Sequence, residues 1–196
     1  MSDLIRCPWP KNDAVYIRYH DVEWGVPVTD DHKQFEFLVL ESAQAGLSWE
    51  TVLKKRENYR KAYLDFDAER IANFCETDIA WLLTNEGIIR NRMKIEASVN
   101  NARQFLKVAS EFGSFSRYLW AFVDFKPVVN HWDHLSQMPA KTALSEKISL
   151  DMKKRGFKFL GPVIIYAHLQ ATGLVNDHLV SCFRHSEIDR IPFPNF

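Results

Sequence analysis

The sequence is poor in cysteine, with three in 196 residues, and this number excludes a fold held together by a framework of disulfide bonds. An odd count fits a reducing compartment, in which we expect Cys75 to be a small buried hydrophobic residue. The first ten residues, MSDLIRCPWP, lack the regions of a signal peptide, and no apolar run approaches the length of a membrane-spanning helix. We therefore expect a cytoplasmic protein without a membrane segment.

The sequence also lacks net charge, because 25 basic residues balance 25 acidic ones, and this balance alone argues against a nucleic-acid partner. The distribution of the basic residues argues differently, because they gather at 54–61 (KKRENYRK), 90–94 (RNRMK) and 153–158 (KKRGFK). A solvated helix face explains any one of these segments. Three of them beside turn glycines are harder to explain in this way.

Alternating strand patterns are scarce, whereas helix signals follow one another along the chain, so we predict an all-α fold in a single domain, residues 1–196. Ser48, Asp67 and Thr77 are the expected N-caps of the helices that follow them. Residues 126–139 show no clear period and are expected to form a loop. The expected helices span 31–45, 49–64, 68–74, 78–86, 92–109, 115–123, 142–155 and 162–172.

Two helices separated by a few residues around Gly87 form a helical hairpin, at about 78–109. The second helix begins among Arg90, Arg92 and Lys94, where free backbone N–H groups and the helix dipole favour phosphate. Such a hairpin grips a DNA backbone without reading bases. An ordinary helical turn with a basic surface explains the same pattern, and on this pattern alone we prefer it.

Four residues from the two ends of the chain form a possible metal-binding set. His178 and Cys182 stand four apart, on one face if the segment is helical, and Cys7 and His20 lie near the N-terminus. Core packing is the common explanation of a lone His/Cys pair, and the spacing falls outside the usual zinc-finger pattern. Two cysteines and two histidines nevertheless suit a closed tetrahedral zinc, whose role would be structural.

Glu41 falls on or beside the apolar stripe of the helix expected at 31–45, where carboxylates are seldom placed without a partner. A partly solvated edge position is the ordinary explanation. Aromatic residues gather in the same quarter of the chain, and an aromatic cluster is most often core. Joined to an acid, it would instead form a pocket that stacks on a flat base, while Glu41 accepts hydrogen bonds from the base edge. These aromatic residues are Trp9, Tyr16, Tyr19, Trp24 and Trp49.

Five longer segments together resemble the 3-methyladenine DNA glycosylase I family of bacterial base-excision repair. They are YHDVEWGVPVTDD, LESAQAGLSWETVLKKRENYR, GIIRNRMKI, KKRGFKFLGP and GLVNDHLVSC, in order along the chain. The resemblance runs from Cys7 to Cys182 and implies a helix-hairpin-helix glycosylase. It also implies that one structural zinc joins the N- and C-terminal segments through Cys7, His20, His178 and Cys182.

Carried over position by position, the resemblance implies a base pocket of Glu41, as the catalytic residue, with Trp9, Tyr16, Tyr19 and Trp49. Leu47 would be the residue that enters the duplex where the damaged nucleotide leaves. Gly87 and the helix after it, with Arg90 and Lys94, would seat the DNA backbone. Two features depart from the family pattern: Met93 stands where some members have glycine, and the segment after Cys182 matches nothing familiar.

The activity implied by the resemblance is base flipping followed by hydrolytic excision of 3-methyladenine from double-stranded alkylated DNA, without strand cleavage. Methylation at N3 makes the adenine a cation and a good leaving group, and cation–π attraction favours it in an aromatic pocket. No lysine is evident for a Schiff base, and nothing ties Asp124 or Asp133 to the pocket. The alternatives are a non-catalytic damage-binding protein of the same fold, a zinc hydrolase, and a glycosylase for another lesion. We expect a monomer.

Overall fold

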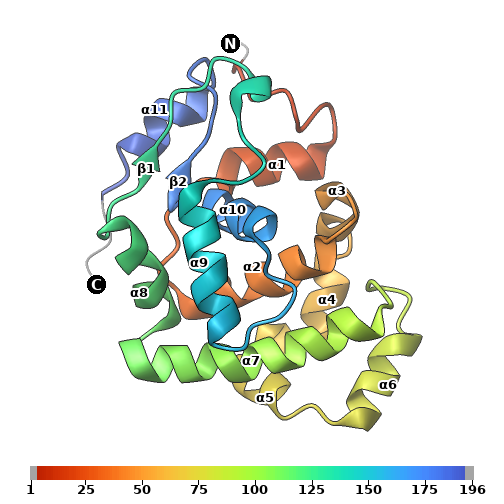
Figure 1. The fold of residues 1–196 in the computed structure, drawn as a ribbon. Coiled ribbons are helices and arrows are strands. Elements are labelled where there is room, and N and C mark those ends of the chain that lie inside the picture. The colour runs from red at the N-terminus through yellow and green to blue at the C-terminus, as the bar shows by residue number, and fades with distance from the viewer. Residues whose placement is uncertain (1–3, 193–196) are drawn as a thin grey trace.

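The computed structural model describes residues 4–192, which are mostly helical, as expected (Figure 1). Within this range no helix is long and apolar enough to cross a membrane. The α-helices are α1 (Ala14–Val22), α2 (Asp31–Gln44), α3 (Trp49–Leu53), α4 (Arg56–Ala62), α5 (Ala68–Ala72), α6 (Glu76–Thr84), α7 (Arg92–Phe112), α8 (Phe115–Trp120), α9 (Ala143–Lys154), α10 (Pro162–Ala171) and α11 (Phe183–Asp189). Short 3-10 turns lie at Leu64–Phe66, Ala121–Val123 and Leu135–Gln137.

Two of the three expected N-caps are confirmed. Ser48 Oγ accepts a hydrogen bond from the backbone N–H of Thr51 (3.2 Å) at the start of α3. Asp67 Oδ1 accepts one from the backbone N–H of Arg70 (3.0 Å) at the start of α5. Each cap satisfies one of the amide groups that the first turn of a helix leaves without a partner.

The expected cap at Thr77 is wrong, because α6 begins at Glu76 with Cys75 as its N-cap. The backbone N–H of Cys75 donates to Asp78 Oδ2 (2.8 Å), and the thiol lies 3.1 Å from the same oxygen. The prediction that Cys75 is buried is also wrong: its place at the beginning of a surface helix leaves it exposed.

The single helix expected at 49–64 is divided into α3 and α4 by a turn at Lys54 and Lys55. The chain changes direction there, and the Arg56 guanidinium reaches the buried carboxylate of Glu36 on α2 (2.8 Å). A buried carboxylate needs such a partner, and this requirement outweighs the local preference for a continuous helix.

The loop expected at 126–139 contains a short strand, so the fold is not helical throughout. β1 (Val128–Val129) pairs in parallel with β2 (Val175–Asn176), and Val128 lies opposite Val175. A bridge between Trp132 and Leu179 continues the pairing. The pairing fixes the path of residues 126–139 beside the segment that follows α10.

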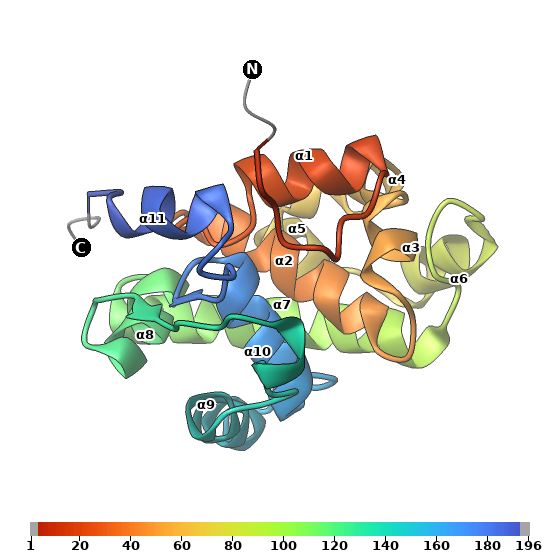
Figure 2. The same cartoon turned by 90° about the horizontal axis from the view of Figure 1, so that it is seen from above.

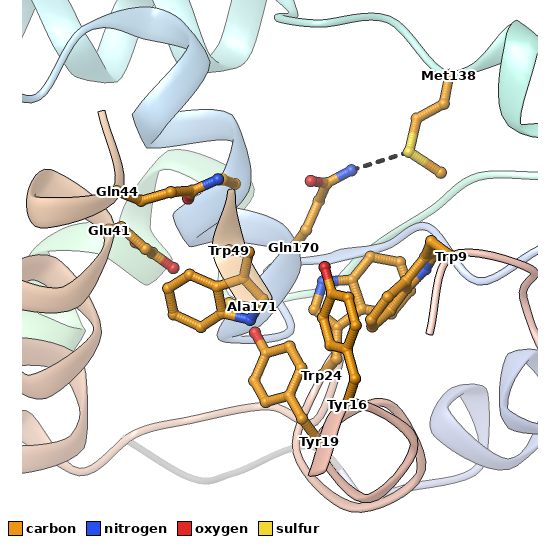
Figure 3. Close-up of a pocket in the computed structure, with 11 residues that line it drawn as sticks. Trp9, Tyr16, Tyr19, Trp24, Glu41, Gln44, Trp49, Met138, Gln170 and Ala171 are labelled. Atoms are coloured by element: carbon orange, nitrogen blue, oxygen red, sulfur yellow. Dashed lines mark hydrogen bonds between the residues drawn. The ribbon is translucent and has the colours of Figure 1, made fainter. Parts of the chain in front are cut away.

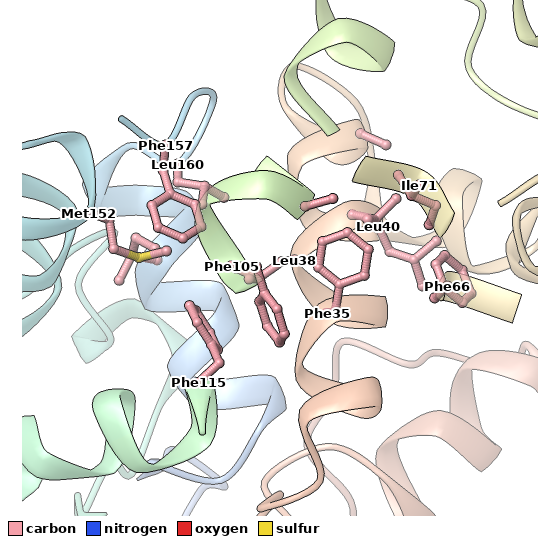
Figure 4. Packing of buried hydrophobic residues seen from close by; sticks show 14 of the residues in the cluster. Phe35, Leu38, Leu40, Phe66, Ile71, Phe105, Phe115, Met152, Phe157 and Leu160 are labelled. Atoms are coloured by element: carbon pink, nitrogen blue, oxygen red, sulfur yellow. The ribbon is translucent and has the colours of Figure 1, made fainter. Parts of the chain in front are cut away.

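α2 runs through the middle of the molecule and packs against α3, α7, α8 and α10 (Figures 1 and 2). Its Phe35 ring meets the ring of Phe105 on α7 with centroids 5.1 Å apart, and Phe105 meets Phe115 on α8 at 4.3 Å (Figure 4). Residues 34–43 of α2 are all buried. Every polar side chain in this stretch therefore needs a partner inside the protein.

The N-terminal segment lies beside the beginning of α11. The backbone N–H of Phe183, at the start of α11, donates to the carbonyl oxygen of Ile5 (2.9 Å). Figure 1 shows residues 4–13 as the loop that leads from the N-terminal segment into α1. The part of the C-terminal segment that had no counterpart in the family pattern thus includes a helix, α11, and residues 193–196 of it lie outside the described residues.

We expect Gly173→Ala to destabilise the fold by about 2–4 kcal/mol, the sum of a left-handed backbone cost and overpacking. Gly173 has φ +72, and a Cβ there would lie 2.6 Å from the carbonyl oxygen of Gly25. Gly113→Ala is the matched control, because its φ is +86 but nothing lies within 4 Å. Urea unfolding measures both, and equal losses of stability would contradict the close approach at Gly173.

Candidate functional site

Cys7, His20, His178 and Cys182 are all buried, and one ligand atom from each lies within 4.8 Å of the others. Cys182 Sγ lies 3.5 Å from both His20 Nε2 and His178 Nδ1, and Cys7 Sγ lies 3.7 Å from His178 Nδ1. The four residues come from the segment before α1, from α1 itself and from the loop between β2 and α11. They can hold a metal ion.

The segment from His178 to Cys182 is a turn and not a helix, so the helical face that would have paired these two residues does not exist. The turn nevertheless brings them together, with support from the backbone N–H of Leu179, which lies 3.4 Å from Cys7 Sγ. Gly25 stands beside the site with φ +82, and a Cβ on it would lie 3.0 Å from His178 Nε2.

The donor set fits a tetrahedral metal ion. Zinc to sulfur and zinc to nitrogen bonds of about 2.3 Å and 2.0–2.1 Å give tetrahedral sulfur–nitrogen edges of about 3.6 Å. The sulfur–nitrogen distances of 3.5–3.7 Å agree with this value.

Each histidine of this cluster is held by a hydrogen bond on its other ring nitrogen. His20 Nδ1 lies 2.8 Å from Asp21 Oδ1, and Asp21 is paired with Arg6. His178 Nε2 lies 3.0 Å from the carbonyl oxygen of Trp24. These bonds place the ring protons away from the cluster and direct the free lone pairs into it, as is usual for histidines that bind metals.

A cavity of about 210 Å³ lies beside this cluster, between α1, α2, α3 and α10 (Figure 3). Its lining includes all five residues that the sequence assigned to a base pocket: Trp9, Tyr16, Tyr19, Glu41 and Trp49. They come from four separate segments of the chain, and the fold brings them together.

The aromatic wall of the cavity is continuous with the Cys/His cluster. The Trp9 ring meets Tyr16 edge-on with centroids 4.9 Å apart, and it also meets His20 of the Cys/His cluster at 5.1 Å. Tyr19, one residue before His20, meets Trp49 at 5.4 Å. The cluster thus braces the wall of the cavity and does not open into it.

Glu41 is the acid of the cavity and is almost completely buried, with 1% of its surface exposed. Its Oε2 lies 2.8 Å from Nδ1 of His168, a fully buried histidine on α10. Its Oε1 is buried without a hydrogen-bond partner among the described residues. Figure 3 shows the carboxyl group directed toward Trp49, whose indole Nε1 is likewise buried and unpartnered.

The two buried glutamates of α2 have pKa values that are shifted in opposite directions. Burial alone would raise the pKa of Glu36, but Arg56 and Lys33 outweigh it and hold the pKa at about 2. Burial also raises the pKa of Glu41, and there His168 lowers it only in part. Glu36 is therefore held in ion pairs within the fold, whereas one oxygen of Glu41 has no hydrogen-bond partner among the described residues.

Several residues of the cavity were not identified as site residues from the sequence. Trp24 belonged to the aromatic cluster but not to the expected site, and the others carried no signal of their own. Gln170 and Ala171 share one face of α10 with Ala167, yet this spacing is typical of any helix. The additional lining residues are Trp24, Gln44, Met138, Ala167, Gln170 and Ala171.

Gln170 presents its carbonyl oxygen to the cavity because its amide nitrogen is already engaged. Gln170 Nε2 donates to Asp177 Oδ2 (2.7 Å) and lies 3.2 Å from Met138 Sδ (Figure 3). Asp177 is buried and also accepts hydrogen bonds from Asn130 and Trp132. The β1–β2 pairing therefore helps to fix a polar atom of the site.

Leu47 lies in the turn between α2 and α3 with 41% of its surface exposed, next to Gly46, whose φ is +79. The Lys94 ammonium group donates to the carbonyl oxygens of Ala43 (2.8 Å) and Ala45 (2.6 Å), at the end of α2. Lys94, expected at the DNA backbone, thus also holds the turn that carries Leu47.

Gly87 and Arg90 lie in the connection between α6 and α7, as expected for a helical hairpin. A Cβ on Gly87 would lie 2.8 Å from Asn58 Cβ, so α4 packs closely against this connection. Arg90 is exposed and lies 3.5 Å from Glu86, a weak surface ion pair. The Met93 side chain, the departure from the family pattern, is also exposed.

The basic segments at 54–61 and 153–158 have acidic partners within the protein. Arg56 pairs with Glu36, and Arg155 pairs with Glu111 (2.7 Å) and Asp151 (2.8 Å). These arginines contribute to the fold. The arginines of the segment at 90–94 also have acidic partners, because Arg92 pairs with Glu76 (2.7 Å), so ion pairing does not single out one basic segment as a phosphate site.

Among the described residues, those that line the cavity include no lysine, and neither Asp124 nor Asp133 belongs to the lining. The cavity therefore offers one carboxyl group, two amide side chains and aromatic rings. It can stack on a flat ring and can accept hydrogen bonds from its edge.

A family model described as methyladenine glycosylase matches residues 9–185 of this chain. The chain is 49% identical to DNA-3-methyladenine glycosylase 1 of Escherichia coli (strain K12), over 90% of this chain and 95% of that protein. It is 48% identical to DNA-3-methyladenine glycosylase of Haemophilus influenzae, over 90% of this chain and 96% of that protein.

Solved structures agree with the sequence matches. A crystal structure of 3-methyladenine DNA glycosylase I superimposes with a TM-score of 0.89 at 50% identity, covering 91% of this chain and 98% of that one. A structure of the enzyme from Staphylococcus aureus, described as the basis of 3-methyladenine recognition, gives a TM-score of 0.88 at 40% identity and covers 97% of both chains.

We expect removal of a bound metal ion by a chelator to lower the Tm by about 10 °C. A ligand at a thousandfold excess over its Kd stabilises by about 4 kcal/mol, and each kcal/mol shifts the Tm by about 2–4 °C at this size. Cys182→Ser is expected to lower metal content as well, whereas Cys75→Ser, at the exposed cysteine, is the matched control. Metal analysis and thermal unfolding check this, and an unchanged Tm after complete chelation would contradict it.

Proposed function

Because the chain belongs to the methyladenine glycosylase family, we propose that it is a DNA-3-methyladenine glycosylase, which hydrolyses the bond between 3-methyladenine and deoxyribose in alkylated DNA. The observation that carries the proposal is the unpartnered carboxyl oxygen of Glu41, buried in an aromatic cavity. An unpartnered buried acceptor costs free energy unless a ligand supplies a donor.

The chemistry of the lesion explains what the cavity contributes. Methylation at N3 gives the adenine a positive charge, so the electron pair of the glycosidic bond leaves with the base and neutralises it. Little protonation by a general acid is needed. The protein must still extrude the base, exclude water from around it and favour the cation. Water then completes hydrolysis at the sugar carbon.

Two features of the cavity favour a methylated adenine. The rings of Trp9, Tyr16, Tyr19 and Trp49 offer faces and edges that attract a flat cation. Glu41 Oε1 is placed to accept a hydrogen bond from the exocyclic amino group of adenine. The absence of a lysine from the described lining supports a monofunctional glycosylase, which forms no Schiff base with the sugar.

We propose that the turn that carries the exposed Leu47 inserts into the DNA duplex. Leu47 would fill the space left by the extruded nucleotide, because an apolar wedge offsets the lost stacking. The connection between α6 and α7, with Gly87 and Arg90, would seat the backbone of double-stranded DNA as a helix-hairpin-helix element. Lys94 would link the two regions, because it already holds the end of α2.

The Cys/His cluster would hold one structural zinc. Four protein ligands leave no open position for a reacting water, so the ion would fix the N- and C-terminal segments and the Trp9 wall. We further propose that the whole chain acts as one domain, as a monomer in the cytoplasm. A pocket, wedge and hairpin within one chain need no second copy.

We expect Glu41→Gln to slow base release by about 10- to 100-fold, the loss of a hydrogen bond to a charged group. Folding and metal content should stay normal. Glu57→Gln is the matched control, because its side chain is 75% exposed on α4. Release of free base from methylated duplex DNA under single-turnover conditions measures the rates.

Full activity in Glu41→Gln would show that the Glu41 carboxylate is not needed for base release. A folded wild-type protein that binds methylated DNA and releases no base would instead be a non-catalytic damage-binding protein of the same fold.

Leu47→Ala is expected to reduce release from duplex DNA by about tenfold, because the wedge offsets part of an unstacking cost of a few kcal/mol. Release from methylated single-stranded DNA should change less, since its bases are less firmly stacked. Leu150→Ala, at a 55% exposed leucine on α9, is the control. Equal losses on both substrates would show that Leu47 does not act as a wedge.

A further inference from the structure

The connection between α9 and α10 exposes two neighbouring residues, Lys158 and Phe159, which we call the 158–159 tip. The residues on either side of the tip, Phe157 and Leu160, are buried in the core (Figure 4), with 5% and 6% of their surface exposed. Phe159 is 38% exposed. The chain is therefore anchored in the core on both sides of an aromatic ring that faces solvent.

Hydrogen bonds from two helices hold the backbone of the tip. The buried side chain of Asn101 on α7 accepts from the backbone N–H of Lys158 (2.8 Å) and donates to its carbonyl oxygen (2.8 Å). Ser149 Oγ on α9 donates to the carbonyl oxygen of Leu160 (2.8 Å). Phe159 has φ +57, a left-handed conformation that bulky residues rarely adopt. A tip that is already fixed in this way loses little conformational entropy when it binds a partner.

The tip and the Leu47 turn are held by the same face of α7. Asn101 lies seven residues after Lys94, which is nearly two helical turns, so the two side chains leave one face about 10 Å apart along the axis. Asn101 holds the tip, whereas Lys94 binds the carbonyl oxygens of Ala43 and Ala45 beside Leu47. A molecule that contacts the Leu47 turn can therefore reach the tip as well.

The tip is also a basic surface. Lys153, Lys154 and Lys158 are exposed, and their ammonium groups make no ion pair or hydrogen bond within residues 4–192. Arg155, between them in the sequence, is instead paired with acidic residues. Lysines beside an exposed aromatic ring suit a phosphodiester backbone, because its phosphates attract the ammonium groups and its sugars offer an apolar face.

We propose that the 158–159 tip is a second contact with duplex DNA, in which Lys158 binds a phosphate and the Phe159 ring packs against a neighbouring deoxyribose. This inference rests on the proposed function, which places the duplex at the Leu47 turn. Successive phosphates of one strand are about 3.4 Å apart along the duplex axis, so a spacing of about 10 Å spans about three nucleotides. The tip thus holds the backbone about three nucleotides from the extruded base, without reading the bases.

Lys158→Gln tests the phosphate contact. The probe is a duplex of about 20 base pairs with a tetrahydrofuran abasic-site analogue, and fluorescence anisotropy gives the Kd for the intact protein between about 50 and 200 mM salt. We expect the slope of log Kd against log salt concentration to fall by about 1, and binding at about 100 mM salt to weaken about tenfold. An unchanged slope in the folded variant would overturn the phosphate contact.

Lys61→Gln is the matched control. Lys61 on α4 is likewise exposed, and its ammonium group makes no ion pair or hydrogen bond in the described part of the chain. It lies in another basic segment, so its removal changes the net charge equally and should leave the slope unchanged. Equal changes in the two variants would show an effect of net charge alone and would also overturn the contact.

Phe159→Ala tests the apolar part of the contact. We expect it to weaken binding about fivefold while the salt dependence stays as in the wild type, because an apolar contact releases no counterions. Leu150→Ala, at a leucine 55% exposed on α9, is the control. Thermal unfolding checks that each variant is folded, and unchanged affinity in Phe159→Ala would overturn the contact of the ring with the duplex.

Base release from methylated duplex DNA by the wild type is measured separately. If the wild type releases 3-methyladenine while Lys158→Gln and Phe159→Ala bind the probe as the wild type does, only the inference about the tip falls. If the wild type releases no base while Lys158→Gln still lowers the slope, the tip contact stands and the glycosylase assignment falls.

Discussion

The need of a buried carboxylate for a partner determines much of this structure. α2 is enclosed by other helices, so Glu36 and Glu41 must both be satisfied inside the protein. Glu36 pairs with Arg56, which lies just after the turn that divides the helix expected at 49–64. Glu41 receives His168 on one oxygen and keeps the other for the cavity. The same helix thus carries one acid that contributes to folding and one that is available to a ligand.

The Cys/His cluster gives the opposite wall of the cavity its rigidity. Trp9 lies only two residues after Cys7, and Tyr19 lies next to His20, so the ligand positions fix the aromatic positions directly. The cavity is formed by segments far apart in sequence, and fixing their side chains in place costs conformational entropy. A metal ion held by this cluster would offset that cost.

The sequence allowed prediction of those features whose residue types are chemically distinctive. Two cysteines and two histidines, an acid in an apolar stripe and a row of aromatic residues each carry their own signal, and the fold brings them together. Gln170 and His168 lie on an ordinary helix, and their roles depend on partners more than a hundred residues away or on the β1–β2 pairing. Lys94 was assigned to phosphate from its place at a helix start, whereas its contacts with the end of α2 arise only from tertiary packing. The cap at Thr77 and the burial of Cys75 were mispredicted because local propensity does not fix where a helix begins.

In the proposed function, the buried carboxyl oxygen of Glu41 selects 3-methyladenine by accepting a hydrogen bond from its exocyclic amino group. Guanine presents the O6 acceptor at that edge, so methylation alone does not admit a purine to the cavity. The most direct measurement is chromatography of the free bases that the metal-loaded wild type releases from methylated duplex DNA. We expect the protein to release 3-methyladenine with little 7-methylguanine. Equal release of both bases, or release of neither, would contradict it.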